Sequence, residues 1–288
     1  MPSVQHSLHF WKMHAAGNVL LLFDTREVHQ QDWSRLSVAT ADAHRAVGHD
    51  GILVVSVGGE GHFGQRMFNP DGTEDFCGNG LRCTAKHLHD RGDIGSEVVC
   101  IETAAGARRV QVLSGEANKA TVRSELGRAD VREVRLTWRG RHAQAVPGRL
   151  RRELTRAIFV DIGTPHLVLL VDHELPDDEW GVASAYLERH SGTSDAAAAR
   201  DPRTSVVWLL PEAPDSARVR IWERAIGETL SCGTGAAAAL AAGQLRGALA
   251  ESARISSPGG VLEVCLDSAG TLWVTGPAET ICEGSWPV

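Results

Sequence analysis

Two cysteines of this chain stand in copies of one short phrase. Gly72–Cys77 leads into Gly78–Gly80, and Gly227–Cys232 leads into Gly233–Gly235, so that each cysteine is followed by Gly-x-Gly. A segment with a helical pattern follows each copy. A cysteine at a helix N-terminus lies beside unpaired backbone N–H groups at the positive end of the helix dipole, and both favour thiolate. Two matched sulfurs, one thiolate and one thiol, can move a proton from one face of a carbon to the other.

The glycines around each cysteine add an anion site to this scheme. The free N–H groups of Gly78, Asn79, Gly233 and Thr234 can hold an α-carboxylate, because glycine lets a ligand approach the backbone closely. The carbanion would depend on a dry pocket and the two helix dipoles for stabilisation. No cofactor is needed. The Gly-x-Gly pieces lack the third glycine and the acidic residue of a dinucleotide site.

A pyridoxal enzyme is disfavoured for a further reason. Such an enzyme needs a Schiff-base lysine, and the few lysines, Lys12, Lys86 and Lys119, stand in no supporting motif.

The remaining cysteines and the histidines suggest less chemistry. The sequence contains no CxxC and no zinc-type Cys/His spacing, so we expect six free thiols in a reducing compartment. His166, in a turn after a glycine, is the one histidine singled out; the alternative is a polar residue at the start of a strand. His87 and His89 are expected to be solvated. Four cysteines are expected to be small buried hydrophobes: Cys83, Cys100, Cys265 and Cys282.

The repeat extends beyond the cysteine phrases. Gly17–Asp24 resembles Gly163–Asp172, since each is a turn, an apolar strand-like run and a closing Asp, and Ala104–Leu113 resembles Pro258–Leu266. The cysteine phrases and these two further pairs of similar segments occur in the same order and at similar spacing in the two halves of the chain. They predict two copies of one domain, with the boundary near Gly127–Val134.

Within each copy the pattern predicts many short strands bounded by Gly or Pro, and few helices. The segment Ser191–Arg203 is predicted to be a loop. Predicted helices are Trp33–Val47, Leu81–His89 before Gly92, and Ala236–Leu245 before Gly247. Predicted strands include Ile52–Val57, Val98–Glu102, Arg108–Leu113, Thr121–Ser124, Ile158–Asp161, Val206–Leu210, Val219–Trp222 and Leu272–Thr275.

The bulk composition excludes several classes. The chain has 288 residues, of which 43% are hydrophobic and 23% charged, as in soluble globular proteins. Its formal charge of −7 does not favour binding to nucleic acid. Met1–Phe10 does not have the pattern of a signal peptide, and no apolar run approaches the roughly 20 residues of a membrane helix. We therefore expect a cytoplasmic protein without membrane or nucleic-acid partners.

With these motifs the chain resembles the diaminopimelate epimerase family, cofactor-independent two-base enzymes of lysine and peptidoglycan synthesis. The resemblance covers nearly the whole sequence. It rests on Lys12–His14 with Gly17-Asn18, Asn69–Glu74, Cys77–Cys83, Gly163–His166, Arg218–Arg224, Gly227–Thr229, Cys232–Gly235, Pro258–Gly260 and Thr275–Ala278.

The resemblance implies an α/β (α+β) fold of two pseudo-symmetric domains, each a β-roll around a central helix, with the active site in the inter-domain cleft. It implies an N-terminal domain of residues 1–130 with a returning segment 277–288, a second domain of residues 131–276, and a homodimer. It also implies roles for the following residues: Cys77 and Cys232 as the acid/base pair, and Asn18, Asn69, Gly78, Asn79, His166, Glu223, Arg224, Gly233 and Thr234 as substrate-binding residues.

One end of the implied site would hold the non-reacting amino acid group of the substrate. This distal end departs from the family pattern. Gly51 stands where the family has Gln, and Thr164 and Ser205 stand where it has Asn, while Val19-Leu20 replaces Asp-Phe. The expected substrate is a small amino acid, with diaminopimelate first. A racemase of another amino acid, a thiol redox protein and an inactive amino-acid-binding protein remain the alternatives.

Overall fold

The structure, a computed structural model, describes residues 7–28, 31–190, 204–224 and 226–287. Contacts divide the chain into two compact units, one of residues 1–125 with 275–288 and the other of residues 126–274. The predicted loop Ser191–Arg203 lies outside the described residues. Within them, no helix combines the length and the apolar character needed to cross a membrane.

The strands of the first unit pair in a closed circuit. The order is β17, β1, β2, β3, β4, β6, β7, β8 and back to β17, with short β5 beside β4. The strands are β1 (Ser7–Ala15), β2 (Asn18–Asp24), β3 (Gly51–Val57), β4 (Phe63–Phe68), β5 (Glu74–Asp75), β6 (Val99–Glu102), β7 (Arg108–Glu116), β8 (Lys119–Gly127) and β17 (Leu272–Pro287).

The second unit uses the same plan. Its strands pair in the order β9, β10, β11, β12, β13, β15 and β16, with short β14 beside β13. The strands are β9 (Asp130–Arg135), β10 (Arg156–Asp161), β11 (Pro165–Leu170), β12 (Ser205–Ala213), β13 (Ser216–Glu223), β14 (Gly227–Thr229), β15 (Ser252–Ser257) and β16 (Gly260–Leu266).

The pairing pattern confirms the internal repeat. In the first unit β2 is parallel to β3, and β4 is parallel to β6. In the second unit β11 is parallel to β12, and β13 is parallel to β15. All other strand pairs with a printed register are antiparallel. A parallel pair needs a long crossover, and each crossover carries a helix at the same place in both units.

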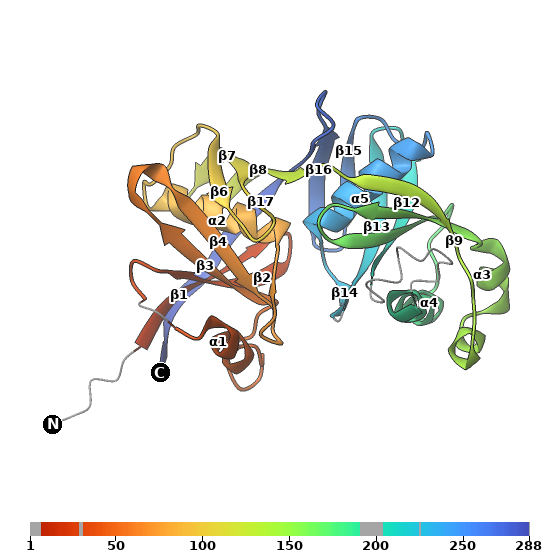
Figure 1. The fold of residues 1–288 in the computed structure, drawn as a ribbon, viewed down its shortest axis with the longest axis horizontal. Coiled ribbons are helices and arrows are strands. Elements are labelled where there is room, and N and C mark those ends of the chain that lie inside the picture. The colour runs from red at the N-terminus through yellow and green to blue at the C-terminus, as the bar shows by residue number, and fades with distance from the viewer. Residues whose placement is uncertain (1–6, 29–30, 191–203, 225, 288) are drawn as a thin grey trace. The chain divides into compact units, whose positions relative to one another are not determined.

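The second crossover helix of each unit lies inside its sheet. These helices are α2 (Gly78–Asp90) and α5 (Gly233–Leu245), labelled among the strands of their units in Figure 1. Most of α2 is buried, and α5 is buried over its first three turns. The alanines of α5 favour helix and leave room for strands to pack closely on every side. Both predicted helices are confirmed, and each begins directly after its cysteine.

The first crossover helix of each unit covers the outer face of the sheet. In the first unit α1 (Trp33–Thr40) packs Trp33 and Leu36 against strand residues that include Phe23 and Ile52. In the second, α4 (Asp177–His190) packs Trp180 and Leu187 against strands β10 to β12. The fold class is therefore as predicted, a β-rich α+β arrangement with one central helix in each of two pseudo-symmetric units.

The predicted helix Trp33–Val47 is too long, because α1 ends at Thr40. The chain then turns: the Asp42 carboxylate accepts hydrogen bonds from the N–H groups of His44 and Arg45, and Gly48 N–H donates to the Thr40 carbonyl. An aspartate side chain that accepts from the backbone two and three residues further on in this way competes with helix continuation. Shorter helical segments not predicted from sequence are α3 (Gly148–Glu153) and the 3-10 turns η1 (Gly59–Gly61) and η2 (Arg141–Ala145).

Four side-chain predictions are also wrong. Cys100 and Cys282 are exposed and Cys265 is half-buried, because each lies on an outward or edge position of a strand, and only Cys83 is a buried hydrophobe. His87 is buried, not solvated, and its Nε2 lies 3.0 Å from Asp24 Oδ2. It is buried because α2 is enclosed on all sides, so the helix has no solvent face at that position.

Candidate active site

Cys77 is the N-cap residue of α2. Its backbone is extended, and its sulfur accepts a hydrogen bond from Gly80 N–H at 3.2 Å. Glycine at position 80 allows close packing, because a Cβ there would lie 2.7 Å from Leu53 Cδ2 and 3.2 Å from Gln65 Nε2 and would displace them. Packing of the first turn against the sheet therefore fixes the N–H group that points at the sulfur. Such a donor stabilises a thiolate.

A network of side chains orients Asn18 toward the same sulfur. Asp50 Oδ2 accepts hydrogen bonds from Asn18 Nδ2 at 3.0 Å and from Val19 N–H at 2.7 Å. The Asn18 amide oxygen therefore turns toward α2, where it accepts from Asn79 Nδ2 at 3.2 Å and lies 3.9 Å from Cys77 Sγ. Arg82, fully buried, donates to Asn79 Oδ1 at 2.8 Å. An amide oxygen at this position can accept a hydrogen bond from the thiol form of Cys77.

Cys232 is the N-cap residue of α5 and repeats the geometry of Cys77. Its sulfur accepts from Gly235 N–H at 3.4 Å. A Cβ at Gly235 would lie 3.0 Å from Ile221 Cδ1, so glycine again sets the close packing of the first turn. Cys232 is buried, whereas Cys77 is half-buried.

A hydroxyl and an imidazole accompany Cys232. Thr234 Oγ1 lies 3.2 Å from Cys232 Sγ and 3.3 Å from His166 Nε2. His166 Nδ1 lies 2.8 Å from the Thr164 carbonyl, which can only accept, so Nδ1 carries the proton. Burial lowers the pKa of His166 to about 4, although the bond to Thr164 opposes this shift. His166 is therefore neutral at pH 7, with Nε2 as an acceptor.

The Thr234 hydroxyl can serve both protonation states of Cys232. When Cys232 is a thiol, the hydroxyl donates to His166 Nε2 and its oxygen accepts from the S–H. When Cys232 is a thiolate, the hydroxyl turns and donates to the sulfur. A hydroxyl hydrogen rotates freely enough for this exchange.

Three further predicted residues, assigned to the distal end of the site, make contacts within their own units. Asn69 closes a turn after β4, and its Nδ2 donates to Thr73 Oγ1 at 3.0 Å. In the second unit, Glu223 Oε1 accepts from Thr229 Oγ1 at 2.7 Å, and Arg224 N–H donates to Ser205 Oγ at 3.2 Å. Ser205 thus fixes the backbone beside Arg224.

Two further departures from the family pattern, at Gly51 and Thr164, have structural counterparts. A Cβ at Gly51 would lie 2.5 Å from Met67 Cε and 3.1 Å from the Phe68 carbonyl oxygen, so the Met67 side chain lies where a larger residue at this position would begin. The Thr164 hydroxyl is buried and has no hydrogen-bond partner within the described residues. The first change replaces a polar side chain by packing, and the second leaves a polar group in need of a partner.

The structure brings the predicted residues into local clusters: Asn18, Cys77, Gly78 and Asn79 in the first unit, and His166, Cys232, Gly233 and Thr234 in the second. The residues that sequence reasoning missed are Asp50, which orients Asn18, and Arg82, which holds Asn79. Asp50 could have been found from the sequence, because it lies next to Gly51, which the family pattern had already singled out. Arg82 had none, since a buried arginine in a helix is not visible in a spacing pattern.

Comparison with known proteins defines the family. The family model for diaminopimelate epimerase matches residues 10–131 and 158–281. The chain belongs to the diaminopimelate epimerase family. Among its relatives, the diaminopimelate epimerase of Pelotomaculum thermopropionicum is 31% identical over 97% of this chain and 99% of its own length. The enzyme of that name from Alkalilimnicola ehrlichii is 34% identical over 96% and 97%.

Solved structures show that the fold of the diaminopimelate epimerase family is shared more widely. A hydroxyproline epimerase from Agrobacterium vitis matches with a TM-score of 0.70 at 15% identity, over 100% of this chain and 94% of its own. A phenazine biosynthesis protein of the PhzF family from Bacillus anthracis matches with a TM-score of 0.70 at 15% identity, over 98% and 100%.

Proposed function

We propose that the chain is a cofactor-independent amino acid epimerase that interconverts LL- and meso-diaminopimelate, with Cys77 and Cys232 as its two bases. Membership of the diaminopimelate epimerase family supports this reaction. The observation that carries the assignment of the bases is the matched pair of N-cap sulfurs, each hydrogen-bonded to the N–H of the glycine three residues on. In the cell, we propose a cytoplasmic homodimer that supplies precursors of lysine and peptidoglycan.

The proposed reaction moves one proton in and one proton out. One cysteine, as thiolate, removes the Cα proton of the substrate and becomes a thiol. The other, as thiol, gives its proton to the opposite face of the carbanion and becomes a thiolate. The substrate leaves inverted, and the two sulfurs have exchanged protonation states, so the reverse reaction uses the same groups in exchanged roles. No electrons are gained or lost.

The environments of the two sulfurs support this exchange of roles. Each sulfur has a backbone N–H donor for its thiolate form. Each also has an oxygen for its thiol form, Asn18 Oδ1 at Cys77 and Thr234 Oγ1 at Cys232. We propose that the N–H groups of Gly78, Asn79, Gly233 and Thr234 bind the α-carboxylate, where the helix dipoles stabilise the charge that develops on it.

A second candidate is a racemase of a different amino acid. It is favoured by the loss of polar groups at Gly51, Thr164 and Ser205, because a second ammonium and carboxylate need buried partners. Asn69 and Arg224, which we propose as distal contacts, favour diaminopimelate, since arginine binds a carboxylate through two hydrogen bonds.

Solvent-deuterium incorporation at Cα decides between these candidates. We expect LL-diaminopimelate to exchange its α-proton and to yield the meso form, and single-centre amino acids such as lysine, arginine and histidine to exchange far more slowly. Exchange confined to one of the single-centre amino acids would replace diaminopimelate as substrate while keeping the chemistry. Absence of exchange with every amino acid would overturn the enzymatic assignment and favour a binding protein.

Thr234 is proposed as a positioning residue for Cys232. Changing Thr234 to valine removes the hydroxyl that can donate to the thiolate and should lower kcat by about 10–100-fold, the value of a hydrogen bond to a charged group. Thr234→Ser keeps the hydroxyl and should restore most of the rate. The rate of Cys232 alkylation by iodoacetamide, followed against pH, should change in the valine variant alone. Equal behaviour of the two variants would contradict this role.

A further inference from the structure

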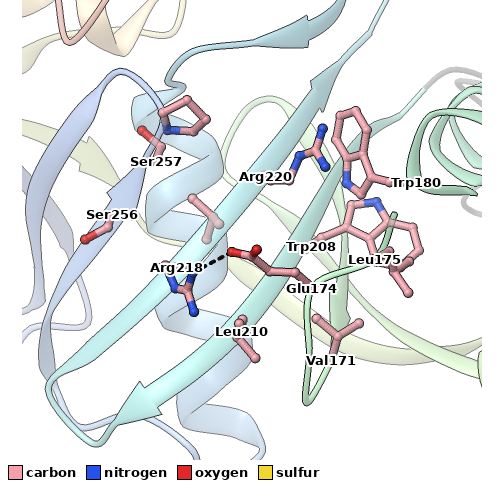
Figure 2. A pocket seen from close by; sticks show the side chains of 12 residues that line it. Val171, Glu174, Leu175, Trp180, Trp208, Leu210, Arg218, Arg220, Ser256 and Ser257 are labelled. Carbon is pink, nitrogen blue, oxygen red and sulfur yellow. Dashed lines mark hydrogen bonds and ion pairs between the residues drawn. The ribbon is translucent and has the colours of Figure 1, made fainter. Parts of the chain in front are cut away.

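The second unit contains a cavity whose lining includes neither Cys232 nor any residue of α5. It has a volume of about 310 Å³ and opens on the outer face of the second unit's sheet, where α4 packs (Figure 2). Its floor is formed by Trp208 and Leu210 of β12 and by Arg218 and Arg220 of β13. Arg218 and Arg220 alternate with Ile221, which faces α5, so the floor and α5 lie on opposite faces of the sheet.

Charges of both signs stand at the mouth of this cavity. Glu174 Oε1 lies 2.5 Å from Arg218 Nη1, the ion pair drawn as a dashed line in Figure 2. Both side chains are about half-exposed or more, at 62% for Glu174 and 49% for Arg218. An exposed pair of this kind is worth little, so a ligand with charges of its own can open it at low cost.

The inner end of the cavity is aromatic and has an unused donor. Trp180 and Trp208 both line it, and the Arg220 guanidinium lies 3.9 Å from the centre of the Trp180 ring. Trp208 donates its indole N–H to Ser184, but the buried indole N–H of Trp180 meets no acceptor among the described residues. The signal of this indole N–H therefore reports on binding, because a ligand in the cavity changes the surroundings of Trp180.

We propose that this cavity binds a free α-amino acid with an aromatic or large apolar side chain. The ammonium of the ligand pairs with Glu174 and its carboxylate with Arg218, so that the zwitterion enters as the complement of the existing ion pair. The side chain of the ligand lies on Trp208 and Leu210. The volume is near the lower end for small-molecule sites, about 300–1,000 Å³, which suits an amino acid better than a nucleotide.

A ligand with only one charge fits less well. Arg218 also pairs with Glu212, and Arg220 with Asp177 and Glu228, so carboxylates outnumber guanidiniums around the mouth. A simple carboxylate would enter against this negative charge, and a simple amine would take Glu174 from Arg218 without offering Arg218 a carboxylate in exchange. The proposed site does not depend on the proposed function, since none of the residues that line it belongs to the clusters around Cys77 and Cys232.

Nitrogen-labelled full-length protein, titrated with L-phenylalanine and followed by the indole N–H signals of its eight tryptophans, tests the proposal. The Trp180 signal, identified with Trp180→Phe, should shift in a saturable way. Phenylpropionate, which lacks the ammonium, and phenethylamine, which lacks the carboxylate, should each bind at least about tenfold more weakly. Equal binding of the three compounds, or no saturable shift with phenylalanine, would overturn the amino acid assignment.

Matched variants separate this cavity from other binding sites. Glu174→Gln and Arg218→Gln should each weaken phenylalanine binding by about tenfold. Glu212→Gln is the control, because Glu212 pairs with Arg218 but does not line the cavity, and its affinity should stay within about twofold of wild type. Leu210→Trp should fill the cavity and abolish the shift. Binding that survives Leu210→Trp would exclude this cavity as the site.

Discussion

Replacing either Cys77 or Cys232 by serine is expected to lower the rate of epimerisation by about 10²–10⁴-fold, the contribution of a positioned acid or base. A serine hydroxyl is far less acidic than a thiol and cannot form the anion that removes the Cα proton. Both variants should fold, because serine can accept the same hydrogen bond from Gly80 or Gly235 at the N-cap position. The conversion of LL-diaminopimelate to the meso form, followed by chiral chromatography, measures the effect.

The control for these variants is Cys100→Ser, because Cys100 is exposed on β6 and lies in neither cysteine phrase. It should retain the wild-type rate. If either Cys77→Ser or Cys232→Ser inverted the substrate at a rate near wild type, the two-base assignment would be refuted, whatever the substrate.

A second large effect is expected on stability, from Asp24. This carboxylate is fully buried at the end of β2 and accepts hydrogen bonds from His87 Nε2 at 3.0 Å and from Arg26 Nη2 at 2.6 Å. Asp24→Asn removes the charge opposite Arg26 and turns one acceptor into a donor. The first unit should lose about 3 kcal/mol, which corresponds to a fall of roughly 6–12 °C in melting temperature. Thermal unfolding at pH 7 measures it.

The same carboxylate predicts the pH dependence of stability. Burial acts to raise the pKa of Asp24, but hydrogen bonds from His87 and Arg26 outweigh burial and hold this pKa well below its usual range. The stabilisation is therefore present above about pH 4 and is lost as the pH falls toward the lowered pKa. In Asp24→Asn, the free energy of unfolding should depend less on pH in this acid range. Asp93→Asn, which removes the other partner of Arg26, should cost less than about 1 kcal/mol; a larger loss than in Asp24→Asn would contradict the argument.

The sequence predicted the features that depend on local repetition. The two cysteine phrases located α2 and α5 because the close packing of each first turn favours a glycine at the same place, at Gly80 and Gly235. Strands such as β3 and β12 were predictable because they are short apolar runs bounded by turn residues. The fold class and the family followed from the same motifs.

Features that depend on tertiary surroundings were not predictable. Nothing in the spacing of His87 indicates that a closed ring of strands buries every side of α2. The helix α4 was missed although Pro176 and three acidic residues in its first turn mark a helix start. The orientation of Asn18 by Asp50, and the contact of the Thr234 hydroxyl with His166, arise between segments far apart in the chain.

The return of β17 to the first unit also affects the order of assembly during synthesis. Residues 126–274 are contiguous and can fold as a unit once they leave the ribosome, whereas the first unit must wait for its last strand. That strand pairs with β1 from Ser7 to His14, and its Pro277 carbonyl accepts from Arg82, the residue that holds Asn79 near Cys77. The surroundings of the Cys77 thiol are thus completed only after β17 has been synthesised, so a product terminated before Leu272 would lack them.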